Sequence, residues 1–549
     1  MMRFCPPQSP ALRAILCIVV LTAAAAAQSP QSAPVDISGP YRIAGVLVNA
    51  ATGEPLRRAT VEAIRDEDSH AVATCITDQE GRFSIDRLAA DKYELSATKR
   101  GFVTAYYDQH DEFSSAVVTG PDQDTTHLLF KLTPGATLRG AVTSDDGDPV
   151  AGARIMLFKK PKHPAAGERM GAGETTITDD TGAYEFSDLV AGDYFMAVIG
   201  DPWYAVHEGP PEKRNPALDV VYPVTYFDST TDEQSATPIV LTGGMRQEVN
   251  LSLHAVPALH ISIAAPRKPD GSIVMPQLQE VVFGNAISSE GSAEIGPAMA
   301  AGDTGTMEMN GIAPGHYQIT QGDPPRVISL GLTASQQVDP NAGSPSNAVS
   351  GRLRLQSGAP PPDDATVSLE RVDNNPGQSI YATDAHQGQF KFDGVPPGEW
   401  ALAATSGNRA LPVIAVAVGA TQRAGNLVSL RERTPELQVT LSDSETDVKG
   451  FARKNGKGFA GAMIVLLPRS PAQWRALTRR DQSDSDGSFA LHNVVPGDYT
   501  LVAIAEGWEV DWTSPQAMAR YLPGGTNVRV SESSGKLVQL NAPVAVQER

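Results

Sequence analysis

The sequence predicts an all-β protein built from about five antiparallel β-sandwich domains in tandem. Three observations predict this fold. One string of turn and strand residues occurs five times in register, and the copies lie about a hundred residues apart. Apolar and polar residues alternate inside each copy, with glycine, proline and aspartate at every gap. The hydrophobic content of 41% is ordinary for a globular chain.

The repeated string is anchored on a glycine. Its five copies read DQEGRFSIDRLAADKYEL, DDTGAYEFSDLVAGDYFM, GDTGTMEMNGIAPGHYQI, DAHQGQFKFDGVPPGEWAL and DSDGSFALHNVVPGDYTL, anchored on Gly81, Gly182, Gly305, Gly388 and Gly487. The intervals between these glycines are 101, 123, 83 and 99 residues. A domain of about a hundred residues can bury its own core. We therefore expect one domain per copy.

Four positions of the string predict the core. Offsets two and four from the glycine point to one face of a strand, offset seven is always aliphatic, and offset twelve is always aromatic. We expect these side chains to be buried, with the polar tip of the last one reaching a backbone group at the rim. Ligand stacking is the alternative for the aromatic position. Offset ten is glycine in four copies and Asp91 in the first, which favours a turn of positive φ.

Residues 1–27 have the features of a secretory signal peptide. Arg3 and Arg13 supply positive charge, and the short apolar run that begins at Ala11 ends in alanines before Gln28. Cleavage would leave Cys75 alone, so no disulfide framework is expected and Cys75 is predicted to be a small buried residue. The formal net charge would change from −19 to −21, which argues against nucleic acid or an anionic membrane as a partner. No later stretch is long enough to span a membrane.

The second copy carries a longer pattern. It has G-x-V, then P-V-x-G-A-x-[IV], then T-D-x-x-G-x-[FY]-x-[FL]-x-x-L-x-x-G-x-Y, beginning at Gly140, Pro149 and Thr178. This pattern resembles the carboxypeptidase regulatory-like domain, a seven-stranded sandwich of transthyretin-like, or prealbumin-like, topology that is also similar to collagen-adhesin B-type and immunoglobulin-like domains. The first and fifth copies match well, the fourth in part, and the third lacks a clean first half.

The resemblance implies exported, multidomain bacterial proteins. The family name comes from a non-catalytic domain attached to certain zinc carboxypeptidases, so it implies no peptidase activity. The expected divisions are a signal peptide at 1–27, a linker at 28–38, and sandwiches at 39–134, 135–256, 257–338 (divergent), 339–435 and 436–549. Placed end to end, five such domains would form a curved rod of about 150 Å, and the sequence leaves open whether the chain folds back instead.

A search for chemistry finds no catalytic motif. The ten histidines are mostly isolated, and His207-Glu208 is followed by Gly-Pro-Pro, which excludes a metal-binding helix of the H-E-x-x-H type. There is no nucleophile elbow, phosphate-binding loop or plausible catalytic cysteine. The acidic turns at 145–148 and 481–487 suggest calcium as an alternative, although aspartate is also common in ordinary turns. We therefore predict no enzyme, no cofactor and no metal.

An aromatic insertion follows the repeated string in the first, second and fifth copies. Its ten candidate ligand-binding residues are Phe102, Tyr106, Tyr107, Trp203, Tyr204, Tyr226, Phe227, Trp508, Trp512 and Tyr521. These rings could cover the side of a sandwich or a seam between domains. Alternatively, they could form a platform for a sugar ring or an extended peptide. Solvent exposure distinguishes the two interpretations.

The leading functional prediction is a non-enzymatic, exported scaffold or adhesion protein of the bacterial envelope or cell surface. The alternative is a carbohydrate- or peptide-binding protein that uses the aromatic insertions, and a more remote one is a peptidase accessory protein. The expected partners are a polysaccharide or an envelope or surface protein. The expected location is the periplasm, the outer surface or the extracellular medium.

Overall fold

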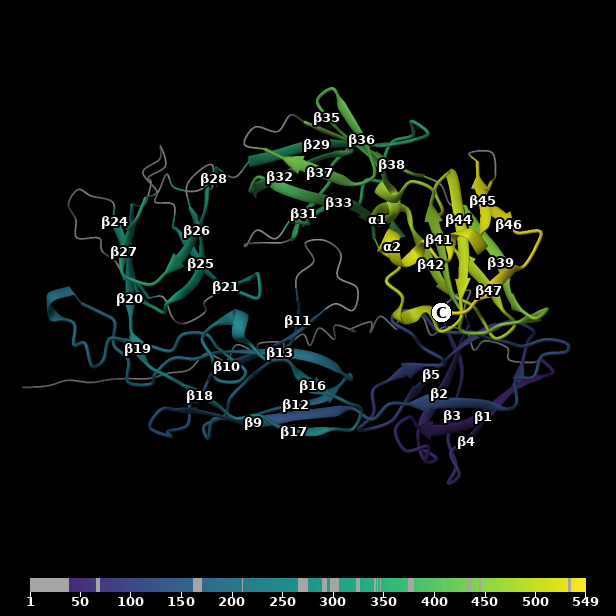
Figure 1. Cartoon of the computed structure of the whole chain (residues 1–549), viewed down its shortest axis with the longest axis horizontal. Helices are drawn as coiled ribbons and strands as arrows, with labels where there is room; N and C mark the ends of the chain where they lie inside the picture. The colour runs from purple at the N-terminus through teal and green to yellow at the C-terminus, as the bar shows by residue number, and fades with distance from the viewer. Residues whose placement is uncertain are drawn as a thin grey trace, which may run out of the picture.

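The computed structural model has five β-rich units, which follow one another along the chain (Figure 1). It describes residues 39–65, 70–160, 170–209, 211–264, 275–288, 294–296, 306–321, 326–339, 342, 344–345, 347–373, 380–407, 409–431, 436–443, 446–531 and 535–549. Each unit has its own hydrophobic core, and the five cores lie within residues 41–132, 136–255, 259–338, 349–441 and 448–546. We number the units 1 to 5 by these cores.

The first two units share the same core strand order. Unit 1 contains β1 (Tyr41–Asn49), β2 (Thr60–Arg65), β3 (Ala71–Ile76), β4 (Arg82–Leu88), β5 (Lys92–Thr98), β6 (Ala105–Tyr106), β7 (Val117–Val118) and β8 (Leu128–Leu132). Unit 2 contains β9 (Ala136–Ser144), β10 (Arg154–Lys159), β11 (Gly171–Ile177), β12 (Ala183–Leu189), β13 (Gly192–Ile199), β14 (Val220–Val221), β15 (Thr225–Tyr226), β16 (Ile239–Leu241), β17 (Arg246–Glu248) and β18 (Leu251–Leu253), and β19 (Val256–Pro257) follows.

The middle units keep the same order of strands. Unit 3 contains β20 (Leu259–Ala264), β21 (Gln277–Val282), β22 (Asn285–Ser288), β23 (Glu294–Gly296), β24 (Thr306–Ile312), β25 (Gly315–Gln321), β26 (Arg326–Leu332), β27 (Gln336–Val338) and β28 (Ser344–Pro345). Unit 4 contains β29 (Asn347–Leu355), β30 (Ala365–Arg371), β31 (Ile380–Asp384), β32 (Gln389–Val395), β33 (Gly398–Ser406), β34 (Arg409–Ala410), β35 (Val413–Val418), β36 (Thr421–Ala424), β37 (Leu427–Leu430) and β38 (Leu437–Leu441).

Unit 5 adds two short helices. It contains β39 (Asp447–Lys454), β40 (Lys457–Gly458), β41 (Met463–Pro468), α1 (Trp474–Leu477), β42 (Arg479–Gln482), β43 (Ser488–Leu491), β44 (Gly497–Ile504), α2 (Pro515–Met518), β45 (Thr526–Val530), β46 (Leu537–Gln539) and β47 (Val544–Gln547). Its last strand pairs with both β39 and β44, so the two layers of the sandwich join at that edge.

Each unit packs two sheets face to face, which confirms the predicted all-β sandwich. In unit 1 the sheets have the orders β4-β1-β8 and β3-β2-β5-β6, and unit 2 repeats them as β12-β9-β17 and β11-β10-β13-β15. The first strand of each unit pairs in parallel with a closing strand, as β1 does with β8, and β44 pairs in parallel with β47; the other pairs are antiparallel. The domain limits drawn from the sequence stay predictions.

The recurring positions are buried in every unit. Offsets two, four, seven and twelve are at most 8% exposed: Phe83, Tyr184, Met307, Phe390 and Phe489; Ile85, Phe186, Met309, Phe392 and Leu491; Leu88, Leu189, Ile312, Val395 and Val494; Tyr93, Tyr194, Tyr317, Trp400 and Tyr499. The predicted bond at the rim also forms. The Tyr499 hydroxyl donates to the carbonyl four residues earlier at 2.6 Å, and Tyr93, Tyr194 and Trp400 donate to the equivalent carbonyl.

The glycine prediction is partly wrong. Positive φ occurs at the anchoring glycine, for example +74° at Gly182, where an added Cβ would meet the Val142 carbonyl oxygen at 2.4 Å. At offset ten, however, Gly315 and Gly497 do not have positive φ. A Cβ on Gly497 would instead lie 3.2 Å from the ring of Tyr499. Glycine therefore leaves space at offset ten for the aromatic ring two residues later.

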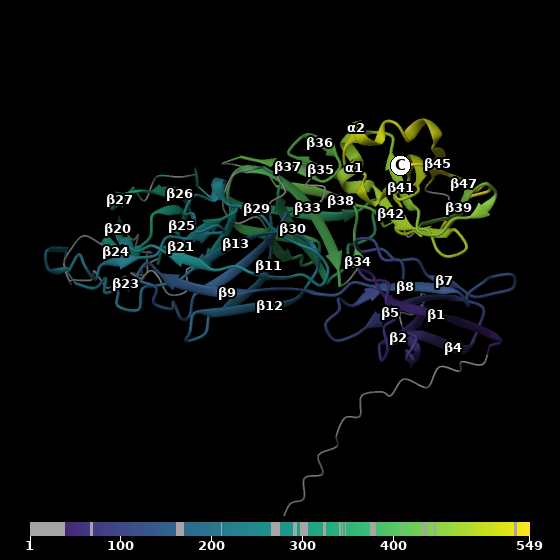
Figure 2. The same cartoon turned by 60° about the horizontal axis from the view of Figure 1, so that its bottom comes forward.

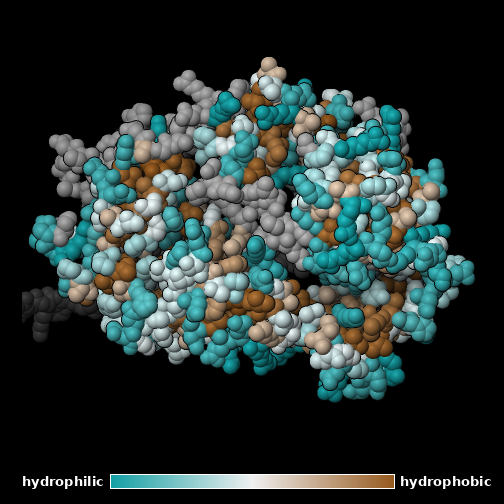
Figure 3. Space-filling view, viewed as in Figure 1, coloured by the Kyte–Doolittle hydropathy of each residue, from teal (hydrophilic) through white to brown (hydrophobic). Residues whose placement is uncertain are grey.

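The five units form a closed arrangement rather than a rod. In Figure 1 the chain runs from unit 1 through units 2, 3 and 4, and unit 5 returns to lie against unit 1. The same contact is visible after the rotation in Figure 2. Hydrophobic residues occupy small, separate areas of the face in Figure 3. No helix among the described residues has the length and apolar character to cross a membrane.

Some predictions lie outside the described residues or are only partly tested by them. The signal peptide, the 28–38 linker and Gly305 fall outside. Cys75 lies on β3 and is half-buried against the core of unit 1. Burial is the main reason that the pKa of its thiol lies above the usual value, so the thiol is a weak nucleophile.

Candidate functional site

The ten aromatic candidates lie in three different surroundings. Trp203 is 85% exposed and contacts Tyr204 edge to face, and Tyr106 is 37% exposed. Phe102, Tyr107, Tyr204, Phe227 and Trp512 are half-buried. Tyr226, Trp508 and Tyr521 are buried in contacts with protein and present no open face to a ligand. Ligand binding by the exposed candidates stays a prediction.

The buried rings point to the contacts between units. In unit 5, Trp508 stacks on His110 of unit 1 with ring centroids 5.2 Å apart, and Phe113 of unit 1 contacts the same indole. In unit 2, Tyr226 contacts Phe283 of unit 3, with centroids 5.1 Å apart. The insertions of units 1 and 2 thus contact a neighbouring unit. At these positions the rings cover a seam between units, as in the first of the two interpretations.

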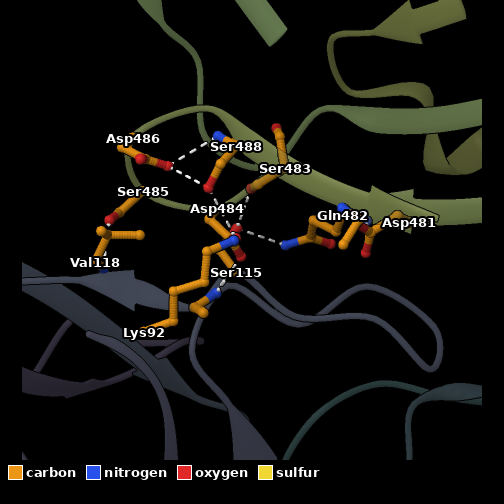
Figure 4. A network of polar contacts seen from close by, with 12 residues as sticks. Lys92, Ser115, Val118, Asp481, Gln482, Ser483, Asp484, Ser485, Asp486 and Ser488 are labelled. Carbon is orange, nitrogen blue, oxygen red and sulfur yellow. Dashed lines mark hydrogen bonds and ion pairs between the residues drawn. The ribbon is translucent and has the colours of Figure 1, made fainter. Parts of the chain in front are cut away.

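The best-connected polar cluster joins the two ends of the chain. We call the contact between residues 107–118 of unit 1, together with Lys92, and residues 479–488 of unit 5 the clasp (Figure 4). Backbone amides of both units form hydrogen bonds across the clasp. The Ser485 amide donates to the Ala116 carbonyl at 3.0 Å, and the Val118 amide donates to the Ser485 hydroxyl at 2.8 Å.

An ion pair lies at the centre of the clasp. Lys92 of β5 pairs with Asp484, whose other carboxylate oxygen accepts from the Ala116 amide at 3.0 Å. The Asp484 side chain is 11% exposed and that of Lys92 is 31% exposed. Burial raises the pKa of Asp484 above the usual range even though Lys92 and these donors favour the charged form. The ammonium group of Lys92 is thus the cation that pairs with the acidic turn at 481–487.

Gln482 connects the remaining polar groups of the clasp. Its amide nitrogen donates to the Asp108 carbonyl at 2.5 Å and to the Ser115 hydroxyl at 2.9 Å. Its side-chain oxygen lies 3.1 Å from Nδ1 of His110. The Ser115 hydroxyl in turn donates to the Ser483 carbonyl at 2.9 Å. Gln482, Ser115 and Ser483 are at most 1% exposed, so the bonds that join these three residues are sheltered from water.

Arg480 closes the outer side of the clasp. Its guanidinium lies over the rings of Phe113 and Trp512, at 5.0 and 4.5 Å from the centroids. It also pairs with Asp111 at 3.7 Å and Glu112 at 2.7 Å. Arginine suits such a position because its planar group stacks on rings and pairs with carboxylates at once.

The turn before the anchoring glycine shows how unit 5 became specialised. In units 1 and 2, Asp78 and Asp179 cap their own turn by accepting backbone amides, such as that of Ala183 at 3.0 Å. In unit 5 the equivalent Asp484 accepts from unit 1 instead, and Asp486 accepts from the Ser488 amide at 2.8 Å. A structural carboxylate of the repeat is therefore redirected to an inter-unit contact.

A second titratable cluster lies between units 2 and 3. The Asp219 carboxylate contacts Nδ1 of His207 at 2.9 Å and Nε2 of His260 at 2.8 Å. Nδ1 of His260 lies 2.9 Å from the side-chain oxygen of Asn310, which also accepts from Arg214 at 3.1 Å. Burial alone would raise the pKa of Asp219, but the hydrogen bonds from the two histidines outweigh it, so its pKa is lowered.

The contacts of the second cluster are those of a carboxylate between two imidazoles. Each histidine of the second cluster faces one oxygen of a single carboxylate, and the contacts of Asp219 include no Ser, Thr or Cys side chain that could act as a nucleophile. Within the described part of the chain, no group of three or more His, Cys, Asp or Glu side chains could hold a metal ion. The arrangement ties unit 2 to unit 3.

Comparison with known families agrees with this architecture. Residues 22–133 and 137–201 match the family model of the carboxypeptidase regulatory-like domain. The match covers unit 1 and the first part of unit 2. In unit 2 it includes the Gly182 turn and the buried Tyr184 and Phe186. A comparison with curated proteins found no match.

Solved structures that are similar to this chain include a pilin, the TIE protein and repeats of a collagen-binding protein. A streptococcal ancillary pilin is 12% identical, with 55% of this chain and 100% of that chain covered and a TM-score of 0.20. The TIE protein of Bacillus anthracis is 11% identical, with 89% and 68% covered and a TM-score of 0.16. Two B repeats of the Staphylococcus aureus collagen-binding protein are 11% identical, with 85% and 93% covered and a TM-score of 0.13. No functional inference rests on these scores.

Sequence reasoning missed the clasp and the second cluster because both join residues far apart in the chain. One signal was available for the clasp. Position eleven after the anchoring glycine is Asp193, Glu399 and Asp498 in units 2, 4 and 5, but Lys92 in unit 1. A reversed charge at a recurring surface position indicates a local partner, and the acidic 481–487 turn is that partner.

Proposed function

We propose that the protein is a non-catalytic, exported scaffold of the bacterial envelope or cell surface, whose regulatory-like units are held in a closed arrangement by the clasp. The observation that carries the proposal is the buried network of Lys92, Gln482 and Asp484. It uses the chain's best-connected polar groups to fix the position of one unit against another. An envelope or surface protein is the expected partner.

The distribution of the repeat residues supports a passive role. Its recurring aromatic and aliphatic side chains fill hydrophobic cores, and its acidic turns cap themselves or bind unit 1. Other side chains, such as Trp508 and Gln482, form contacts between units. A scaffold needs this division, in which rigid modules are joined by specific interfaces.

The test is to open the clasp without unfolding the units. Asp484→Lys puts a like charge beside Lys92 and should increase the radius of gyration in small-angle X-ray scattering, while the circular dichroism of the β-units is retained. Asp443→Lys, at an exposed site in unit 4, is the matched control. Fractionation of the native host tests export at the same time. An unchanged radius, or a cytoplasmic location, contradicts the proposal.

A specific check addresses catalysis. Among the described residues, Asp219 is the carboxylate that contacts two imidazoles, those of His207 and His260. A hydrolytic activity on peptide or ester substrates that disappears in Asp219→Asn, with the fold intact, would show that the protein is an enzyme. We expect no such activity.

The second candidate function is carbohydrate or peptide binding at the unit 2 insertion. It is favoured by the exposure of Trp203, which stands 85% in solvent beside Tyr204. Retention on glycan beads should fall in Trp203→Ala and persist in Trp508→Phe, since Trp508 is buried. Equal retention of Trp203→Ala and the parent protein would eliminate this candidate.

A further inference from the structure

The second cluster, between units 2 and 3, holds charged groups at a contact that the clasp does not include. The insertion of unit 2 supplies His207, Arg214 and Asp219, and unit 3 supplies His260 on β20 and Asn310 on β24. The side chain of Arg214 is 7% exposed, that of Asp219 is 11% exposed, and those of the two histidines are 15% exposed. Each polar group of the cluster therefore depends mainly on protein partners.

Arg214 determines which way the side-chain amide of Asn310 points. One guanidinium nitrogen of Arg214 lies 3.1 Å from the amide of Asn310, and also 3.1 Å from a carboxylate oxygen of Glu308. Because a guanidinium can only donate hydrogen bonds, the atom of Asn310 that faces it must be the carbonyl oxygen. The same oxygen lies 2.9 Å from Nδ1 of His260. Nδ1 of His260 therefore carries a hydrogen and donates it.

Asp219 determines the state of the other ring nitrogen of His260. Nε2 lies 2.8 Å from one carboxylate oxygen of Asp219, whose second oxygen faces His207 at 2.9 Å. Burial would raise the pKa of Asp219, but the hydrogen bonds of the two histidines lower it, so the carboxylate is ionised and only accepts. Nε2 therefore carries a hydrogen as well. With hydrogens on both nitrogens, the His260 ring is a cation.

The ion pairs of the cluster balance when His260 is in this form. His260 and Arg214 are then positive, and Asp219 and Glu308 are negative. Asp201 is a further carboxyl group in this part of unit 2, and burial raises its pKa. The strand β27, which pairs with the other side of β20, reads Gln-Gln-Val and carries no charge. Loss of the proton from His260 would leave these pairs with one uncompensated negative charge.

Loss of that proton would also break one of the two side-chain hydrogen bonds of His260. A neutral ring has a single N–H, so a ring nitrogen without hydrogen would face either the Asn310 oxygen or the Asp219 carboxylate. Two acceptors would then meet in a site shielded from water, which is unfavourable. The bond to Asp219 joins units 2 and 3 directly, and Asn310 joins them through Arg214. Either loss weakens the contact between the two units.

We propose that His260 is a pH-sensitive lock between units 2 and 3, which its imidazolium form closes and its neutral form loosens. Histidine is the side chain whose ordinary change of charge falls between about pH 5 and 8. The closed contact holds a proton that the unfolded chain releases in this range, so the stability of the contact falls as pH rises. The inference adds a regulatory device to the proposed scaffold, and it depends neither on export nor on the clasp.

Nitrogen-15 NMR of the full chain, labelled at its histidines, tests the protonation state. The signals of His260 are those that disappear in His260→Gln. We expect both ring nitrogens of His260 to have the shifts of an imidazolium at about pH 6 and to lose them as the pH is raised to about 8. A ring that carries a single hydrogen at about pH 6 overturns the proposal.

Hydrogen exchange, corrected for the intrinsic effect of pH on exchange, tests the lock itself. Amides of β20 and β24 should exchange about tenfold faster at about pH 8 than at about pH 6, since one bound proton changes an equilibrium by at most about tenfold per pH unit. The same measurement in Glu280→Gln excludes the nearby Glu280 carboxyl, which also titrates in this range, as the cause. Equal exchange at the two pH values overturns the proposal.

Two substitutions of Asn310 should move the change in opposite directions. Asn310→Asp places a carboxylate beside the His260 ring, favours the cation and should shift the change to higher pH by about one unit. Asn310→Leu removes the acceptor, so a ring with one hydrogen satisfies Asp219 and the pH dependence should shrink several-fold. His316→Gln, at an exposed histidine of unit 3, is the matched control and should behave as the parent chain. Identical profiles in the two Asn310 variants overturn the proposal, whereas scattering of the clasp variant tests the scaffold independently.

Discussion

The contact between units 1 and 5 and the contact between units 2 and 3 use equivalent loops, but different side chains lie at their centres. In both, the insertion that follows the fifth main strand meets a strand pair of another unit. The clasp is polar and centred on Lys92, Gln482 and Asp484. The other contact is aromatic, because Phe283 enters a box formed by Phe158, Phe195 and Tyr226. The fold therefore fixes where a unit makes contact, and the local side chains decide how.

The largest expected effect is at the aromatic contact. Phe283 is 7% exposed and meets three rings, so Phe283→Ala should destabilise the unit 2 to unit 3 contact by about 3 kcal/mol. Denaturant unfolding, with hydrogen exchange at β21 and β13, measures the loss. Phe451→Ala, at a ring that is 39% exposed on unit 5, is the control and should change little. Equal losses in the two variants would refute the aromatic anchor.

The next effect is at the clasp. Lys92→Met keeps the aliphatic stem but leaves Asp484 buried without its counter-charge, which should cost about 2 kcal/mol after allowance for the partial exposure of Lys92. Hydrogen exchange should rise at Ala116 and Ser485 and stay constant in unit 3. Lys449→Met, at an exposed lysine, is the control. Unaltered exchange at Ala116 would show that the ion pair does not hold the clasp.

Protons should strengthen both contacts. Burial raises the pKa of Asp481, next to the clasp, and of Glu280, next to the aromatic contact, to about 7. Each folded pKa lies above the unfolded value, so the folded state binds more protons in this range. Stability should therefore rise by about 1 kcal/mol per group as pH falls from about 8 to about 6. Local hydrogen exchange over that range measures it.

Two variants divide the pH effect between the contacts. Asp481→Asn should remove it from β42 and β43 alone, and Glu280→Gln should remove it from β21 alone. If stability instead rises with pH at both contacts, the carboxyl groups are not the ones that bind the protons.

The smallest effect concerns the cluster beside the aromatic contact. His260→Gln removes a ring that links Asp219 to Asn310 and should cost about 1 kcal/mol. His127→Gln breaks a comparable pair with Asp124, but that histidine side chain is 82% exposed, so no measurable loss is expected. Thermal melts of both variants in parallel test the difference. A larger loss in His127→Gln would invert the comparison.

The fold could be predicted because each unit repeats a local pattern. Alternation along a strand places Phe83 and Ile85 on one face whatever the rest of the chain does, and the five copies repeat this at equivalent positions. The rim bond of Tyr499 also follows from the tight turn four residues before it. Such features depend on residues within about twenty positions of one another.

The contacts between units could not be predicted in the same way. Lys92 and Asp484 are 392 residues apart, and nothing in the local pattern around either one specifies the other. The sequence shows where the aromatic insertions lie along the chain, but it does not show what surrounds their rings in the folded protein. Trp203 and Trp508 occupy the same offset, yet one is 85% exposed and the other 4%, because only the second meets another unit.

The closed arrangement also limits how copies of the chain can associate. The two halves of the clasp are different surfaces, so a pair of open chains would join head to tail and could extend into a filament. When unit 5 binds unit 1 of its own chain, both complementary surfaces are used at once. Because both surfaces belong to one chain, closure is an intramolecular step that competes with encounters between copies. The backbone bond between Ala116 and Ser485 thus occupies surfaces that open chains could otherwise use to join one another.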